Sequence, residues 1–208
     1  MTPEAILDRG LAALGQDCPL AVRARLLDYV RLLAKWNRVY NLTAVREPGE
    51  MVTRHLLDSL VVRPFLQGER ILDVGTGAGL PGIPLALTEP QRRFVLLDSN
   101  SKKTRFVQQA VLELGLDNVQ VAQARVEAFQ SEAPFDAVIS RAFASLADMV
   151  RLAARHCAQD GVLLAMKGTV AEQELAELPA GYAVQWIEAL VVPGLDEERH
   201  LVCLKASA

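Results

Sequence analysis

The sequence feature that most constrains the fold is a glycine-rich turn that directly follows an apolar segment. Residues 70–74 form a predicted β-strand, and the residues after it carry glycine at every second position: Gly75, Gly77 and Gly79. Glycine tolerates positive φ and lets a ligand approach the backbone closely. The helix predicted to begin near Gly82 would offer free backbone N–H groups to polar atoms of that ligand. The turn therefore predicts a binding site at the carboxyl end of a strand.

Acidic residues at the ends of two predicted strands narrow the class of ligand. Asp73 lies near the end of the first strand, and Asp98 directly follows the second, which is predicted over residues 93–97. A carboxylate at the end of the second strand can accept both hydrogen bonds of a ribose diol. The pattern therefore predicts a cofactor that contains a nucleoside.

The glycines alone leave two cofactors open. The spacing from Gly77 to Gly82 satisfies the dinucleotide fingerprint, with an acid at about the expected distance beyond it. The spacing from Gly75 to Gly79, preceded by Asp73, also satisfies the S-adenosylmethionine loop of class I methyltransferases. A tight turn without a ligand is the third interpretation. Only the rest of the chain can distinguish between these three interpretations.

Composition sets broad limits on the fold. The 208 residues suffice for one domain with a small appendage, and a hydrophobic content of 51% argues against disorder. No apolar run reaches the roughly 18 residues of a membrane span, and no secretory signal is visible. The three cysteines, Cys18, Cys157 and Cys203, are far apart and lack metal-binding spacing. We therefore expect a cytoplasmic protein without a membrane segment or a metal site.

Charge is distributed unevenly along the chain. Residues 20–70 carry nine Lys/Arg against five Asp/Glu, whereas residues 171–208 carry two against seven, and the formal net charge is −3. A basic N-terminal segment on an acidic protein is compatible with a phosphate-rich partner on one face. The other interpretation is a solvated helix face.

The order of predicted elements indicates an α/β fold. Helical patterns occupy residues 4–14, 20–36 and 51–65, and predict an N-terminal helical extension over residues 1–68. From residue 69 to 208 strands then alternate with helices, which predicts a parallel sheet with helices on both faces. The strands after the first two are predicted over residues 119–122, 135–139 and 161–166; the helices begin near residues 82, 102, 126 and 146.

The last part of the chain distinguishes between the two cofactor classes. After a short predicted helix at 170–178, the extended runs 182–192 and 200–204 flank Pro193-Gly194 and are predicted to form a closing hairpin. Seven strands that end in an antiparallel hairpin are typical of methyltransferases, whereas a dinucleotide fold would continue with parallel units. We therefore expect a class I S-adenosylmethionine-dependent methyltransferase fold, a Rossmann-like seven-stranded sheet.

Six motifs occur in an order that is similar to one known family. They are Trp36-Asn37-x-x-x-Asn41-Leu42-Thr43, Arg54-His55-Leu56-Leu57-Asp58-Ser59, the glycine loop continued as Leu80-Pro81-Gly82-Ile83-Pro84-Leu85-Ala86, Asp98-Ser99-x-x-Lys102-Lys103, Ser140-Arg141-Ala142-Phe143-Ala144 and Lys167-Gly168. Over roughly residues 30–168 the chain closely resembles the RsmG (GidB) family, the bacterial 16S ribosomal RNA guanine-N7 methyltransferases.

The resemblance implies S-adenosyl-L-methionine as cofactor and small-subunit ribosomal RNA, or an assembling small subunit, as partner. It also implies a set of cofactor-binding positions: Gly75, Gly77, Gly79, Leu80, Asp98, Ser99, Asn100, Val126, Glu127 and Arg141. Arg141 is expected near the centre of methyl transfer.

The chemistry that the resemblance implies needs no general base, because N7 of guanine carries an in-plane lone pair and no proton. Catalysis would then be mainly alignment, helped by electrostatic preorganisation. The residues expected to position the reactants are Arg141, Lys167, Asn37 and Asn41. Basic residues expected to hold RNA phosphates are Arg31, Lys35, Arg38, Arg46, Arg54, Lys102, Lys103 and Arg105.

Two other functions are considered. An NAD-dependent oxidoreductase would need a catalytic Tyr with a Lys about four residues on, but Tyr182 is followed at that spacing by Trp186. A non-catalytic nucleotide-binding, RNA-associated protein would keep the pocket without the reaction. An intact glycine loop with Asp98 and Arg141 argues against such a decayed site.

Overall fold

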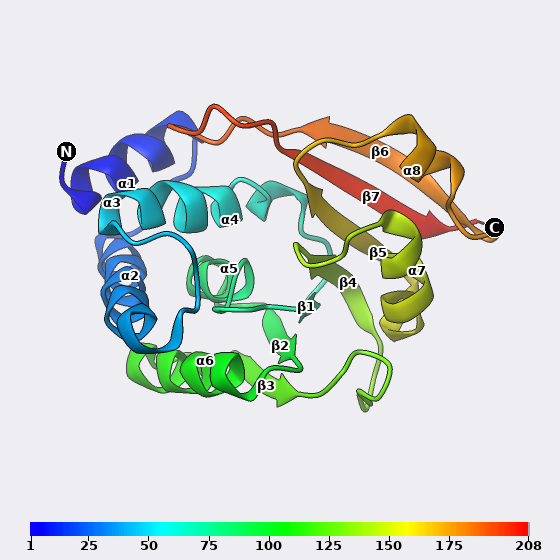
Figure 1. Ribbon diagram of the computed structural model, residues 1–208, viewed down its shortest axis with the longest axis horizontal. Helices are drawn as coiled ribbons and strands as arrows, with labels where there is room; N and C mark the ends of the chain where they lie inside the picture. Colours follow the sequence, from blue (N-terminus) through cyan, green and yellow to red (C-terminus); the bar gives the residue numbers. More distant parts are fainter. Residues whose placement is uncertain (208) are drawn as a thin grey trace.

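The strands of the computed structural model, which describes residues 1–207, form one sheet in the order β3-β2-β1-β4-β5-β7-β6 (Figure 1). Their bounds are β1 (Arg70–Val74), β2 (Arg93–Asp98), β3 (Val119–Gln123), β4 (Phe135–Ser140), β5 (Cys157–Lys167), β6 (Tyr182–Ala189) and β7 (His200–Ala206). β7 runs antiparallel to both of its neighbours, β5 and β6, and the remaining pairs are parallel. The predicted seven-stranded sheet with its closing hairpin is confirmed.

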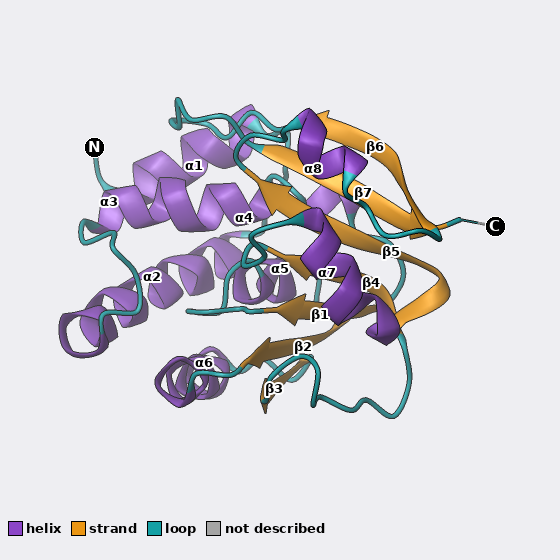
Figure 2. Ribbon diagram, turned by 45° about the vertical axis from the view of Figure 1, so that its right-hand side comes forward, coloured by secondary structure: helices purple, strands orange, loops and turns teal. Residues whose placement is uncertain are grey.

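Helices flank the sheet on both faces (Figure 2). The helices between the strands are α5 (Gly82–Thr88), α6 (Ser101–Leu114), α7 (Leu146–Ala153) with η3 (Ala154–His156), and α8 (Glu172–Ala176). Side chains of α7 pack with one face of β1, β4 and β5, whereas α5 and α6 belong to the cluster on the opposite face. None of the helices within residues 1–207 has the length and apolar character that crossing a membrane requires.

The N-terminal elements are helical, as the sequence predicts. They are α1 (Pro3–Ala13), α2 (Leu20–Tyr40), α3 (Pro48–Met51), η1 (Val52–Leu57), α4 (Asp58–Leu60) and η2 (Arg63–Phe65). The segment predicted as a single helix over 51–65 changes its winding along its length, because η1 is a π-helical stretch between two α-helical ones. Such stretches often occur at functional sites.

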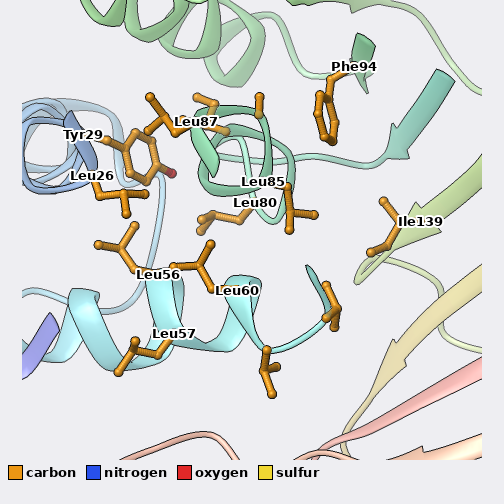
Figure 3. Close-up of a cluster of buried hydrophobic side chains, with 14 of the residues drawn as sticks. Leu26, Tyr29, Leu56, Leu57, Leu60, Leu80, Leu85, Leu87, Phe94 and Ile139 are labelled. Carbon is orange, nitrogen blue, oxygen red and sulfur yellow. The ribbon is translucent and has the colours of Figure 1, made fainter. Parts of the chain in front are cut away.

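One hydrophobic cluster joins the N-terminal helices to the sheet. Leu26 and Tyr29 of α2, together with Leu56 and Leu60, meet Leu80 and other buried side chains beside α5 (Figure 3). The Tyr29 hydroxyl also donates a 2.7 Å hydrogen bond to the carbonyl of Ala78 in the glycine-rich turn. The N-terminal helices therefore pack directly against the segment that carries the predicted cofactor site.

The predicted helix that begins at Val126 is wrong. Residues 126–128 form a turn, in which the N–H groups of Ala128 and Phe129 donate to the carbonyl of Arg125. Phe129 then packs against Phe135, and none of residues 130–134 between these two is a large apolar residue. The segment therefore lacks the apolar residues that a second helical turn would bury.

Candidate active site

The glycine-rich loop between β1 and α5 has the backbone conformation that the sequence predicts. Gly75, Gly77 and Gly79 have φ values of 69°, 60° and 88°. A Cβ atom at Gly75 would lie 2.5 Å from the Cβ of Ala142, and one at Gly79 would lie 2.5 Å from the Cδ1 of Ile83. Beside Gly77 the nearest atom would be the Gly75 carbonyl oxygen at 3.9 Å. Gly77 is thus the glycine whose open side leaves room for a ligand.

Asp73 of β1 stabilises this loop through hydrogen bonds to its two ends. It is fully buried, and its Oδ2 accepts hydrogen bonds from the Thr76 hydroxyl at 2.7 Å and from the Gly82 N–H at 2.9 Å. Burial raises the pKa of Asp73 to about 6, because the charged form loses hydration. The expectation that the Gly82 N–H is free for a ligand is therefore wrong, since Asp73 already occupies it.

Asp98 links the end of β2 to the same loop. Its Oδ2 accepts from the Gly77 N–H at 2.9 Å, and its Oδ1 accepts from the Asn100 N–H at 2.8 Å. The Asn100 side chain in turn caps α6 by accepting from the N–H groups of Lys102 and Lys103. Ser99 and Asn100 are exposed, whereas Asp98 is 8% exposed. The carboxylate is therefore held rigidly beside Gly77.

A cavity of about 210 Å³ opens beside the loop and is lined by residues from distant parts of the chain. Gly77 and Leu80 line it from the loop, and Arg141 lines it from the segment just after β4. Thr43 and His55 contribute from the N-terminal helical region. The two strand-end segments of the lining, after β1 and after β4, thus lie at the carboxyl edge of the sheet, where ligands bind in open α/β folds.

His55 is a neutral side chain in this cavity at pH 7. It lies in η1, is 6% exposed, and its Nε2 is 2.9 Å from the hydroxyl oxygen of Thr43. Within residues 1–207 its Nδ1 has no hydrogen-bond partner. Burial lowers the pKa of His55 to about 4, because the imidazolium form would lose its hydration.

Arg141 is held by a carboxylate that the sequence analysis did not select. Its Nη1 donates to the Oδ2 of Asp58 at 2.9 Å, and the Nε of Arg199 donates to the Oδ1 of the same residue at 2.9 Å. Asp58 is 3% exposed. These three residues are separated by 83 and 58 positions in the chain, so no local pattern relates them. Asp58 appeared only within a motif of the family resemblance.

The other residues expected to position the reactants lie outside the cavity lining. Asn37 is buried, and its amide accepts from the Thr43 N–H and donates to the Val45 carbonyl, so it shapes the loop that carries Thr43. Asn41 ends α2 with a φ of 50° and accepts from Arg46.

Lys167, at the end of β5, donates to Glu174 and to the carbonyl of Ala144, each at 2.8 Å. It therefore ties β5 to α8 and to the segment after β4.

Val126 and Glu127, two expected cofactor-binding residues, lie in the turn that follows β3. The Val126 carbonyl oxygen lies 2.9 Å from the Nε2 of His156. The Glu127 side chain is exposed.

The basic residues predicted to hold phosphates fall into two groups. Three already have partners within the chain: Arg31 pairs with Asp28 and Glu4, Arg54 with Glu197, and Arg46 with Asn41. A second set has no ion pair among the described residues: Lys35, Arg38, Lys102, Lys103 and Arg105. Lys103 also lines the cavity.

Among residues 1–207 we find no group of three or more His, Cys, Asp or Glu side chains placed to hold a metal ion.

Comparisons with known proteins agree on one family. Residues 23–202 match the family model for rRNA small subunit methyltransferase G. The chain is 56% identical over 200 residues to the ribosomal RNA small subunit methyltransferase G of Methylococcus capsulatus, covering 96% of this chain and 97% of the relative. It is 53% identical over 201 residues to the protein of the same name from Cronobacter sakazakii, covering 97% of each.

A solved structure supports the fold. The glycopeptide N-methyltransferase MtfA, complexed with S-adenosylhomocysteine, superposes with a TM-score of 0.61 at 11% identity, covering 74% of this chain and 87% of that one. Because its identity to this chain is low, this likeness shows the class I methyltransferase fold alone.

Proposed function

The chain belongs to the rRNA small subunit methyltransferase G family, and from this premise we propose that it transfers a methyl group from S-adenosyl-L-methionine to N7 of a guanine in small-subunit (16S) ribosomal RNA. The observation that carries the proposal is one cavity at the carboxyl edge of the sheet. There the open side of Gly77, tied to Asp98, lies close to Arg141. The glycine loop would hold the cofactor, and Arg141 would face the nucleotide.

The residues present fit this cofactor. Gly77 has the positive φ and the open side that let a ligand lie against the backbone. Each oxygen of the Asp98 carboxylate accepts one backbone N–H hydrogen bond. A carboxylate oxygen can accept a second one. Ribose hydroxyls can use that capacity. Leu80 supplies an apolar wall to the same cavity.

The proposed reaction relies on alignment. When bound, S-adenosyl-L-methionine supplies a methyl group on a sulfonium centre that the N7 lone pair can attack. The chain has to orient the guanine and exclude water, and alignment of this kind can lower a reaction barrier by roughly 7–11 kcal/mol. Because N7 carries no proton, the reaction needs no base, and His55, whose Nε2 lies 2.9 Å from the Thr43 hydroxyl oxygen, is assigned no proton transfer. Arg141 uses Nη1 for Asp58, and its other N–H groups remain to orient the nucleotide.

The RNA would lie across the surface where α2 approaches α6 (Figure 1). Exposed Lys35 and Arg38 of α2, and Lys102 and Arg105 of α6, give this surface a positive charge. Contacts from such side chains to phosphates fix register and orientation without reading sequence. The target guanine must be unstacked, or lie in a loop, to reach the cavity.

In this proposal residues 1–68 form an extension that closes one side of the cavity of a methyltransferase core at 69–208, because Thr43 and His55 line that side. We also place the protein in the cytoplasm, where its partner would be the ribosomal RNA or the assembling small subunit.

The test is transfer of a labelled methyl group from S-adenosyl-L-methionine to small-subunit rRNA by the purified chain. We expect incorporation into the RNA, and retention of S-adenosyl-L-methionine but not NAD in equilibrium dialysis. Cofactor binding without any methyl transfer to RNA or to assembling subunits would instead support a non-catalytic binding protein. Binding of NAD in place of S-adenosyl-L-methionine would overturn the assignment.

A further inference from the structure

Asp58 is a buried carboxylate that two arginines share. Each of its oxygens accepts one hydrogen bond of 2.9 Å, from Arg141 on one side and from Arg199 on the other. The carboxylate is far more buried than the two guanidinium groups, whose side chains are 29% and 25% exposed. The bonds are charge-assisted, which makes them shorter and stronger than neutral ones.

The three side chains come from three different parts of the fold. Asp58 begins α4, Arg141 follows β4, and Arg199 precedes β7. Of the three, only Arg141 lines the cavity beside the glycine loop. Asp58 and Arg199 therefore contact Arg141 from outside the lining of the cavity.

Arg199 is itself held by a second ion pair, which leads to the N-terminal helices. Arg199 also donates to Glu197 at 3.3 Å, and Glu197 accepts two hydrogen bonds from Arg54 at 2.7 and 3.0 Å. Arg54 belongs to η1, the same π-helical stretch that carries His55. The segment before β7 is thereby fixed to the N-terminal helices, and Arg199 is held in place against Asp58.

This geometry determines what happens when the carboxylate is lost. Without the charge of Asp58, the guanidinium group of Arg141 would have no ion-pair partner among residues 1–207, whereas Arg199 would keep Glu197. Arg141 would then move away or become disordered. In a reaction that depends on alignment, a misplacement of about 1 Å can cost on the order of a hundredfold in rate.

We propose that Asp58, supported by Arg199, is a positioning residue that sets the place of the Arg141 guanidinium in the cavity. The proposal rests on the proposed methyl transfer, but it concerns two residues, Asp58 and Arg199, that do not line the cavity. Asp58 acts only through Arg141, so its effect on the reaction should depend on Arg141 being present.

The test is a double-mutant cycle measured by single-turnover methyl transfer with enzyme in excess. Asp58→Asn keeps the shape of the side chain and removes its charge. In the otherwise unaltered chain, we expect this change to slow transfer by at least about tenfold, while affinity for S-adenosylhomocysteine changes by less than about threefold. In the Arg141→Ala background, the same change should slow transfer by less than about threefold, because the group through which it acts is gone.

A matched control removes an exposed carboxylate that pairs with an arginine elsewhere. Asp8 of α1 accepts from Arg23 at 2.9 Å and is more than half exposed, so Asp8→Asn should leave the rate unchanged in both backgrounds. If Asp58→Asn does not fold, Arg199→Gln replaces it, because that change removes the arginine that supports Asp58 and leaves both Asp58 and Arg141 in place. Its effect should likewise disappear in the Arg141→Ala background.

Two results would overturn the proposal: no slowing by Asp58→Asn in the unaltered chain, or an equal slowing in both backgrounds, which would mark a general structural role. Failure of the proposed function has a different signature, because the unaltered chain would then transfer no methyl group to RNA.

Discussion

The backbone N–H of Gly77 donates a 2.9 Å hydrogen bond to Oδ2 of Asp98, which joins the glycine-rich loop to the end of β2. The same carboxylate accepts from the N–H of Asn100 at the start of α6. Asp98 therefore shapes the loop on which a cofactor would lie, and its oxygens can still accept hydrogen bonds from that cofactor. An acid that contacted only the cofactor would contribute nothing to the shape of the loop.

We predict that Asp98→Ala weakens binding of S-adenosylhomocysteine by more than tenfold, since hydrogen bonds to charged groups contribute roughly 1.5–3 kcal/mol each. Because the N–H groups of Gly77 and Asn100 also lose their acceptor, the variant should unfold at a lower temperature. Calorimetric titration and thermal unfolding measure the two effects. Asp117→Ala, which removes an exposed acid at the amino edge of the sheet, is the control and should change neither. Unchanged affinity in Asp98→Ala would rule out the ribose assignment.

The glycine at position 77 offers a second prediction with a closely matched control. Gly77 and Gly115 have φ values of 60° and 59°, and a Cβ atom at either meets no close neighbour. Replacing either by Ala should therefore cost a similar backbone strain of roughly 1–2 kcal/mol. Of these two variants only Gly77→Ala should abolish binding of S-adenosylhomocysteine, because Gly77 lines the cavity and Gly115 does not. Normal binding by a folded Gly77→Ala chain would show that the cofactor does not lie against this residue.

Much of the fold is predictable from the sequence because the signals are local. Apolar runs separated by helical patterns predict the sheet, and the three glycines after residue 74 predict positive φ where the structure has it. The helix expected from Val126 is wrong because Phe129 finds its contact with Phe135 after a single turn. A short apolar pattern cannot distinguish a turn from the beginning of a helix.

The support of the candidate site is not predictable in the same way. Asp58, Arg141 and Arg199 meet only because α4, β4 and β7 come together in space, and each residue alone resembles an ordinary charged side chain. Asn37 is a residue that the motif selected but whose amide has partners within the chain. Its place in a motif indicated a role with the reactants, but both polar atoms of its amide are used to shape the loop at Thr43.

The buried histidine predicts how stability depends on pH. The pKa of His55 is about 4 in the folded chain, below its ordinary value of 6.5, so between these values the unfolded chain binds more protons. The free energy of unfolding should therefore fall as the pH drops from about 6.5 towards 4, by on the order of 3 kcal/mol from this group. Urea unfolding at pH 7.5 and 4.5, compared with the same measurement on His55→Gln, isolates the effect. A difference between the two proteins that does not change with pH would contradict it.

The RNA surface can be tested within a single helix. Arg38 of α2 is exposed and forms no ion pair among residues 1–207, whereas Arg31, two turns earlier, pairs with Asp28 and Glu4. We predict that Arg38→Ala raises the KM for RNA and reduces the slope of log affinity against log salt concentration by about 0.7–0.9. Arg31→Ala should have a smaller effect on both quantities. Cofactor affinity should stay unchanged in each variant. Equal salt slopes for Arg38→Ala and the unaltered protein would place the RNA elsewhere.

The most direct test of the central claim is mass mapping of methylated nucleotides in small-subunit rRNA from cells that lack this protein, with and without the gene restored. We predict that one N7-methylguanosine disappears in its absence and returns with the unaltered chain. The Arg141→Ala chain should restore much less of it, since that change removes one of the two cations that line the cavity beside the glycine loop and slows transfer without abolishing it. An unchanged methylation pattern of the small-subunit rRNA, or loss of a methyl group from a position other than guanine N7, would contradict the account.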